Sequence, residues 1–116
     1  MKKVSFEEIG AVTATFAVQE GTSGGQVVKV TGQGEAGPCA AGEDFCGVAL
    51  EGRDGFAAVQ VKGFAQVKAA GALEPGWVKL TADGQGGVQA AAGESGGREF
   101  LVVETDSTAG TAVLYL

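Results

Sequence analysis

The sequence predicts a small all-β protein with one folded domain, and three observations support this. Apolar and polar residues alternate with a period of two in several segments, glycine occupies 21 of 116 positions, and no segment of sufficient length has a helical period. Glycine makes up about 7% of an average protein. Here it separates short apolar runs without a collagen-like repeat. This arrangement is typical of a β-barrel, or of a β-tulip or sandwich, with many glycine turns.

The clearest strand pattern runs from Val59 to Lys68. Apolar residues such as Val59, Val61 and Val67 stand at odd positions, and lysine or glutamine stands at positions 60, 62, 66 and 68. The same residues at helical spacing present no apolar face, so a strand is predicted. Gly63 interrupts it and predicts a bulge or sharp bend, which lets one long strand serve two parts of a barrel.

Other segments carry weaker strand patterns. The alanine-rich stretches at 69–73 and 89–92 are shorter than two helical turns and are bounded by glycine, so no helix is predicted there. The apolar runs near the C-terminus are nearly continuous, as in strands buried on both faces. Residues 1–10 are assigned to an N-terminal arm or a first short strand, and residues 11–116 to a single β domain. Strands are expected at 12–18, 27–30, 47–50, 77–80, 100–103 and 111–116.

Two parts of the chain resemble each other. Residues 25–34 read Gly-Gln-Val-Val-Lys-Val-Thr-Gly-Gln-Gly, and residues 76–84 read Gly-Trp-Val-Lys-Leu-Thr-Ala-Asp-Gly. Each is followed by an alanine- and glycine-rich stretch and then by an apolar strand that begins at Phe45 or Phe100. A duplicated strand–turn–strand unit explains this similarity, and so does chance in a chain so rich in glycine and valine.

Charge and hydropathy restrict the classes of partner. Eight basic residues against 14 acidic ones give a net charge of −6, which disfavours binding to nucleic acid. No apolar run approaches the roughly 20 residues that a membrane-spanning helix needs, so no membrane partner is expected. Glu7 and Glu8 interrupt the place where a signal peptide would have its apolar region, so export is not expected.

The sequence offers little for catalysis, and we expect no enzymatic activity. Gly32 to Gly37 match the G-x-G-x-x-G pattern, but Pro38 and short strands follow where dinucleotide binding requires a helix. Histidine is absent, so a serine or cysteine nucleophile would lack its usual base. Acidic pairs such as Glu43/Asp44 are interpreted as solvated loop residues.

No metal or cofactor is expected either. Cys39 and Cys46 have no further cysteine or histidine to complete a zinc site. Two reduced thiols are favoured, and a disulfide across this short loop is left open. The segment from Asp83 to Gly87 has one carboxylate where a calcium loop needs several oxygen ligands, so it is interpreted as a turn.

Aromatic and basic residues give the candidate partner contacts. Trp77 and Tyr115 are the only residues of their kinds, and core packing is favoured for both because they lie in apolar strands. An exposed Trp77 would instead anchor a partner, as aromatic residues do at interface hot spots. The one locally basic segment is the N-terminal one, which is either a solvated end or an arm that docks on another chain: Lys2, Lys3, Val4, Ser5 and Phe6.

The order of these features resembles the head-decoration, or capsid-stabilising, proteins of tailed bacteriophages. The likeness covers residues 22–90, and the chain departs from the family in its cysteine pair and in its C-terminal part. The residues that carry the likeness are Gly25–Thr31, the Ala40–Gly42 turn, Cys46–Glu51 (Cys-Gly-Val-Ala-Leu-Glu), Val59–Gly63, and Leu73–Leu80 followed by Asp83-Gly84.

The resemblance implies a small β-barrel or β-tulip that forms homotrimers on the capsid surface and binds the major capsid protein. The segment from Lys2 to Phe6 would be the family's N-terminal arm. The protein would be found in the virion, and in the bacterial cytoplasm before assembly, and its function would be mechanical, without cofactor or catalysis. The alternative from the residues alone is a β-barrel of bacterial or prophage origin that binds a small molecule or glycan, with Trp77 or Phe64 as the stacking platform.

Overall fold

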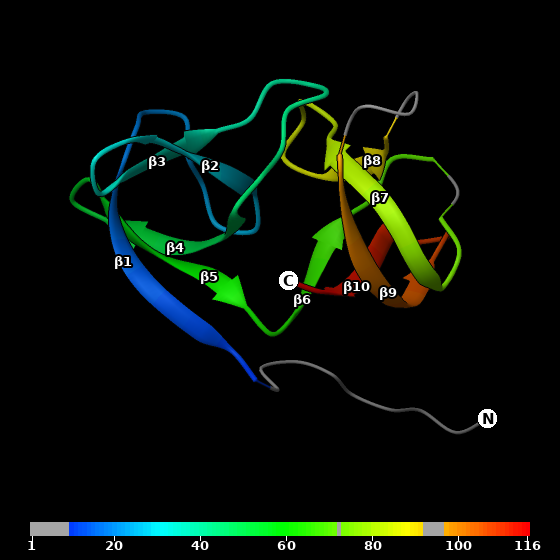
Figure 1. Cartoon of the computed structure of the whole chain (residues 1–116). Coiled ribbons are helices and arrows are strands. Elements are labelled where there is room, and N and C mark those ends of the chain that lie inside the picture. Colours follow the sequence, from blue (N-terminus) through cyan, green and yellow to red (C-terminus); the bar gives the residue numbers. More distant parts are fainter. Residues whose placement is uncertain (1–9, 72, 92–96) are drawn as a thin grey trace.

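The computed structural model of the chain describes residues 10–71, 73–91 and 97–116, and these residues form strands, turns and loops without a helix. The predicted all-β fold is confirmed. Figure 1 shows two groups of strands side by side, with the N-terminal half of the chain in one and the C-terminal half in the other. The molecule measures 42 × 33 × 22 Å along its principal axes.

The first half forms a closed five-stranded barrel in the order β1-β3-β2-β4-β5, which we call the first barrel. Antiparallel pairing of β1 with β5 and parallel pairing of β1 with β3 close it. Closure removes free strand edges, which would otherwise be open to pairing with other chains. The strands are β1 (Val12–Val18), β2 (Val27–Gly32), β3 (Glu35–Pro38), β4 (Gly47–Arg53) and β5 (Phe56–Lys62).

The second half forms a five-stranded sheet in the order β6-β10-β9-β7-β8, which we call the second unit. Its two outer strands approach each other through one parallel bridge between Ala69 and Val88. The sheet therefore curls until it is almost closed. Its strands are β6 (Phe64–Lys68), β7 (Gly76–Ala82), β8 (Val88–Ala90), β9 (Arg98–Asp106) and β10 (Thr111–Tyr115).

The two halves have the same topology. If β1 to β5 are matched in order with β6 to β10, every strand pair of the first barrel has its counterpart in the second unit. Even the parallel closure is repeated, because Val18 lies opposite Ala36 as Ala69 lies opposite Val88. The similarity between residues 25–34 and 76–84 thus falls on matching strands, β2 and β7.

The pairing registers give residue-by-residue counterparts between the halves. The outward-facing pair Val27–Val48 matches Trp77–Leu101, and the inward-facing pair Ala49–Val59 matches Val102–Leu114. Further matches are Ala14 with Ala65 on the first strands, from their pairing with Val59 and Leu114, and Val30 with Ala82 on the second strands, from their pairing with Ala36 and Val88.

Gly63 joins the halves and confirms the predicted bend. Strand β5 ends at Lys62 in the first barrel and β6 begins at Phe64 in the second unit, so one alternating segment serves both sheets. The φ angle of Gly63 is 98°, and an added Cβ would lie 2.6 Å from the Gly10 carbonyl oxygen and 2.7 Å from the Ala11 backbone. Its carbonyl accepts a 2.9 Å hydrogen bond from the Leu116 amide.

A shared core holds the halves together. Buried residues of the first barrel, Val27, Phe45 and Val48, lie in one apolar cluster with the inward-facing residues of the second unit. The rings of Phe45 and Phe100 stack with centroids 4.9 Å apart. A smaller cluster of Val28, Ala36, Ala49 and Val59 fills the first barrel itself.

The loop between β3 and β4 fixes this contact with polar bonds. The backbone of Ala82 donates a 2.9 Å hydrogen bond to the Glu43 carbonyl and accepts another of 2.9 Å from the Gly42 amide. The Glu43 carboxylate also bonds to the Lys29 ammonium at 2.7 Å and accepts the Ala40 amide at 2.7 Å. Because the hydrogen bond from Lys29 and then that from Ala40 favour the charged carboxylate, the pKa of Glu43 is lowered.

Two short strands were not predicted from the sequence. Strand β3 contains Pro38 and two small residues, and β8 has only three residues, so neither carries a readable alternation. Both form because each pairs along a longer neighbour, β3 with β2 and β8 with β7. The Gly32–Gly37 segment, which matches the G-x-G-x-x-G pattern, thus lies in the hairpin between β2 and β3 and does not begin a helix.

The close backbone approach at Gly63 predicts that replacing this glycine destabilises the fold. Gly63→Ala should lower the free energy of unfolding by about 3 kcal/mol or more, because a positive φ costs about 1–3 kcal/mol and the added Cβ also clashes with backbone. Urea denaturation measures this. Gly34→Ala is the matched control, since Gly34 also has a positive φ (67°) but open space around its Cβ, and should cost only about 1 kcal/mol. Equal costs would contradict the assignment.

The bonds of Glu43 predict a dependence of stability on acid. The contribution of its carboxylate is present above the ordinary pKa of 4.5 and is lost as the pH falls through the lowered pKa of the folded state. Glu43→Gln should therefore reduce stability at neutral pH and flatten its decline below pH 4.5. Thermal melting across this pH range, with exposed Glu51→Gln as control, tests it. An unchanged pH profile in Glu43→Gln would contradict the prediction.

Candidate partner-binding surfaces

Trp77 lies on the outer face of the second unit. Its side chain is 66% exposed, and Leu101 lies directly opposite it on β9. The next outward pair along these strands is Lys79 with Glu99, both exposed. The expectation that Trp77 packs in the core was wrong, because alternation along β7 turns Leu80 inward and Trp77 outward.

Tyr115 occupies a different environment from Trp77. It is half-buried, and its ring meets that of Phe64 edge to face with centroids 5.0 Å apart. The Lys62 ammonium lies 5.6 Å from the Tyr115 ring centroid. These contacts hold Tyr115 and Phe64 at the junction of the two halves, so the packing role expected for Tyr115 fits its place.

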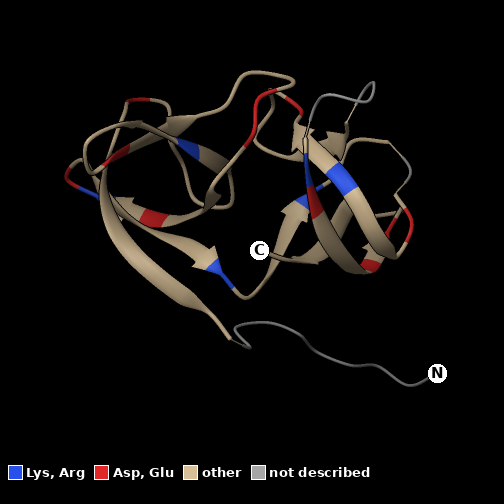
Figure 2. Cartoon of the chain, in the orientation of Figure 1, with Lys and Arg blue, Asp and Glu red and all other residues tan. Residues whose placement is uncertain are grey.

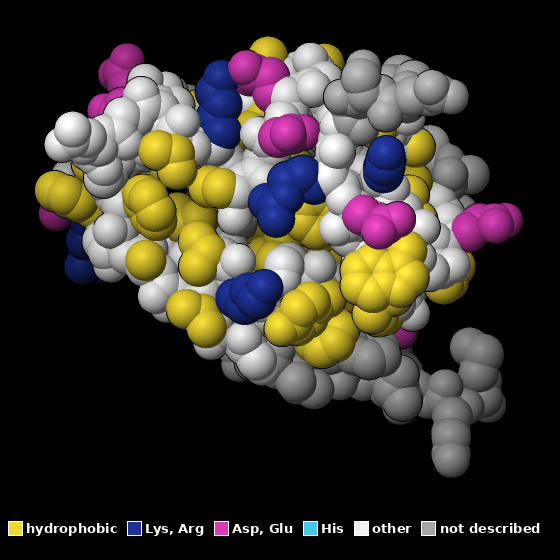
Figure 3. Space-filling model, in the orientation of Figure 1, with side chains coloured by type: hydrophobic (Ala, Val, Ile, Leu, Met, Phe, Trp, Pro, Cys, Tyr) yellow, Lys and Arg dark blue, Asp and Glu magenta, His cyan; other side chains and the backbone are white. Residues whose placement is uncertain are grey.

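Further apolar residues are exposed on the first barrel. Figure 3 shows apolar side chains gathered over this half as well as over part of the second unit. Isolated exposed apolar residues are ordinary, whereas contiguous apolar patches mark surfaces that other proteins bind. The large apolar side chains exposed here are Val12 at 53%, Val30 at 56%, Leu50 at 40% and Phe56 at 55%.

The basic N-terminal segment lies outside the described residues. The expectation that Lys2, Lys3, Val4, Ser5 and Phe6 contact a partner therefore stays a prediction. Of the sequence-predicted contact residues, the structure places Trp77 alone.

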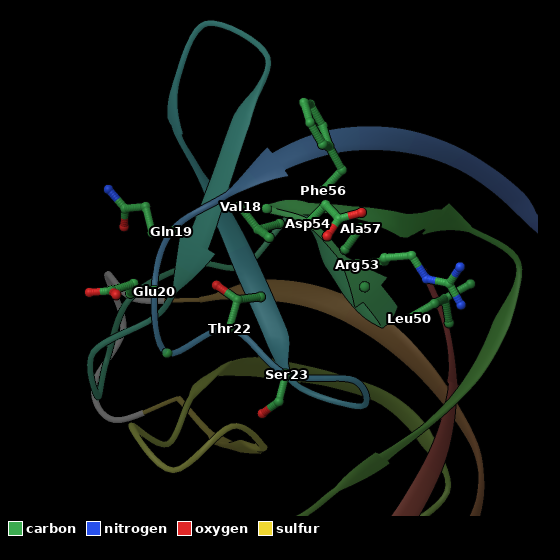
Figure 4. A pocket seen from close by; sticks show the side chains of 13 residues that line it. Val18, Gln19, Glu20, Thr22, Ser23, Leu50, Arg53, Asp54, Phe56 and Ala57 are labelled. Carbon is green, nitrogen blue, oxygen red and sulfur yellow. The ribbon is translucent and has the colours of Figure 1, made fainter.

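One hollow of about 260 Å³ lies between the β1–β2 connection and the β4–β5 turn. Figure 4 shows that Gln19 and Glu20 point to one side and the Arg53 guanidinium to the other. The Thr22 hydroxyl is buried there without a partner among the described residues. Specific ligand sites have several convergent polar groups. This hollow does not provide them.

A second hollow, of about 470 Å³, lies where β4 and β5 approach β6 and includes Phe64 and Gln66. The buried Gln60 amide on its wall already donates to the carbonyl oxygens of Lys62 and Phe64, at 3.1 and 3.0 Å. Its donor therefore stabilises the bend between β5 and β6, and it is not directed at a ligand.

The two thiols are separate. Cys39 is buried in the shared core and Cys46 is half-buried, and neither forms a disulfide. Burial, followed by the nearby Glu43 charge, raises the pKa of Cys39 to about 11, and burial also raises that of Cys46. Both are thus protonated at neutral pH, and a protonated thiol is a weak nucleophile.

Charges are dispersed over the surface. The six basic residues of the described part each lie on a different strand, as Figure 2 shows for several of them: Lys29, Arg53, Lys62, Lys68, Lys79 and Arg98. Such dispersion gives no basic stripe of the kind that follows a phosphate backbone. In the same residues, no group of three or more potential metal ligands comes together, and no helix is long and apolar enough to cross a membrane.

Comparison with known proteins gives no further guide. No family model matches this chain, and no curated protein matches it.

The raised thiol pKa values predict slow alkylation. At pH 7.5 the folded protein should react with iodoacetamide about a hundredfold or more slowly at Cys39 than unfolded protein does, because so little thiolate is present. Mass spectrometry over time measures this, with the urea-unfolded chain as control. Rapid labelling of Cys39 in the folded state would contradict its placement in the core.

Proposed function

We propose that this protein decorates and stabilises a bacteriophage capsid by binding the major capsid protein. The observation that carries the proposal is the set of exposed apolar side chains on rigid strands, of which Phe56 and Trp77 are aromatic. Aromatic residues on a preorganised surface give binding energy at a small cost in conformational entropy. A protein surface suits them better than a small ligand does.

The placement of the family-like segments supports the proposal. Gly25–Thr31 and Cys46–Glu51 fall mainly on β2 and β4, and Val59–Gly63 falls on the end of β5 and the bend after it. Leu73–Leu80 leads into β7, and Asp83 forms the turn after that strand by accepting the amides of Gln85 and Gly87. The resemblance is thus carried by the strands and turns that build both halves.

In this function the protein acts mechanically. Copies bound at the capsid surface add buried interface between capsid subunits, which resists the pressure of the packaged DNA. The protein also associates with itself, as a homotrimer on the capsid. It resides in the virion, and in the bacterial cytoplasm before assembly. No cofactor, nucleic acid or membrane takes part.

The alternative is a barrel that binds a small molecule or glycan. Its platform would be Trp77, which lies on an open sheet face, or Phe64, whose ring packs against Tyr115. A ligand of this class would raise the melting temperature with increasing concentration. Saturable stabilisation by a small molecule would favour this alternative over decoration.

Decoration predicts saturable binding to shells. The full chain should co-sediment with expanded, DNA-free shells of the major capsid protein encoded beside it, at a fixed copy number per capsomer. A truncation that lacks residues 1–5 should keep the melting temperature of the full chain and bind the shells at least tenfold more weakly. Sedimentation across a concentration series measures both.

The two parts of this experiment have separate contradicting results. No binding of the full chain to shells would reject decoration. Equal binding by the truncated and full chains would reject the arm and leave decoration standing. Bovine serum albumin mixed with the same shells is the control for trapping in the pellet.

A further inference from the structure

We propose that copies of this chain associate head to tail, with the outer β7–β9 face of one copy covering the open end of the first barrel in the next. The Trp77 face comprises Trp77 and Leu101. The open barrel end comprises Ala14, Phe16, Val30 and Val61. This inference rests on the self-association included in the proposed function and names the surfaces that produce it.

The contact within one chain is the model for this contact between chains. Val27 and Val48 are an opposed pair on the outer β2–β4 face, yet they are only 1% and 4% exposed. They are buried because they cover the inward-facing residues of the second unit, together with Phe45. The outer β2–β4 face of one half therefore covers the end of the other half.

The matching outer face of the second unit has no such cover from the described residues. Its pair Trp77–Leu101 is the counterpart of Val27–Val48, and Trp77 is 66% exposed. The apolar pair Trp77–Leu101 thus occupies an open position on the second unit, whereas the matching pair Val27–Val48 of the first barrel is buried. The difference in exposure arises because the outer β2–β4 face packs on the second unit, whereas none of the described residues packs on the outer β7–β9 face in the same way.

The end of the first barrel shows the complementary difference. Ala82 and Ala65 in the second unit are 1% and 7% exposed, while their counterparts Val30 and Ala14 are both exposed. Val30 alternates with Lys29 along β2, so it lies on the same side as buried Val28, towards the barrel interior. Among the described residues, this end thus leaves the apolar side chains of Val30 and Ala14 exposed.

One further pair around this end shows the same difference. Phe16 at the open end is half-buried where its counterpart Val67 is 2% exposed, while Val61 is half-buried like its counterpart Leu116. The described part of one copy therefore carries both halves of an interface that it has already formed once internally. Two different surfaces that meet head to tail form a heterologous contact, which closes into a ring or extends.

The proposal predicts an assembly in solution. Size-exclusion chromatography with light scattering should give a mass above that of a single chain, rising with concentration. Trp77 is the only tryptophan, so its emission should shift to the blue as the assembly forms. Trp77→Lys and Val30→Glu should each raise the dissociation constant about 30-fold or more, which is the scale of an interface hot spot.

Phe56→Ser is the matched control. Phe56 is 55% exposed, similar to Trp77 and Val30, but belongs to neither surface, so the variant should assemble as the unaltered chain does. Circular dichroism and the melting temperature establish that each variant is folded. A monomeric unaltered chain at all concentrations, or full assembly by folded Val30→Glu, would overturn the proposal.

A mixture of the two variants tests the head-to-tail arrangement. Trp77→Lys keeps an intact barrel end and Val30→Glu keeps an intact Trp77 face, so the mixture should yield a species of two chains that neither variant forms alone. Association of Val30→Glu with itself through Trp77 would indicate a symmetric contact and reject the arrangement. Capsid binding is not measured here, so this failure and a failure of decoration are separate results.

Discussion

The structure depends on the burial of one outer face of the first barrel against the interior of the second unit. Val27, Val48 and Phe45 supply this face, and Phe45 stacks on Phe100 inside the second unit. Each such side chain contributes about 2 kcal/mol by leaving water. The second unit is closed by a single bridge between its outer strands, so these residues complete its core.

Backbone geometry sets how the halves meet. Gly63 turns the chain from one sheet to the other at a point where the Gly10 carbonyl and the Ala11 backbone leave no room for a side chain. Gln60 supports the same bend by donating to carbonyls on both sides of it. The loop from Ala40 to Phe45 then holds the opposite side through Glu43. Two sheets with the same topology therefore end with unequal surfaces, because each is covered on a different side.

The difference between the exposed surfaces of the two halves connects the fold to the proposed role. A rigid body with apolar residues on separate strands, dispersed charges and thiols that are weak nucleophiles is suited to bind other proteins. The first barrel exposes an end that its counterpart buries, and the second unit exposes a face that its counterpart buries. Decoration of a capsid uses such surfaces repeatedly, because many copies must fit the same lattice.

The sequence by itself determined the fold class and most strands, because period-two alternation from Val59 to Lys68 and glycine at the bend are local signals. It also indicated the repeat, although only the matching strand order separates duplication from chance. Strands β3 and β8 were missed because their pairing comes from neighbours and their own residues carry no pattern. Tertiary structure alone decided that Trp77 is exposed while Val27 is buried. Val27 and Trp77 lie on the matching strands β2 and β7, and their exposure depends on which face the other half of the chain covers.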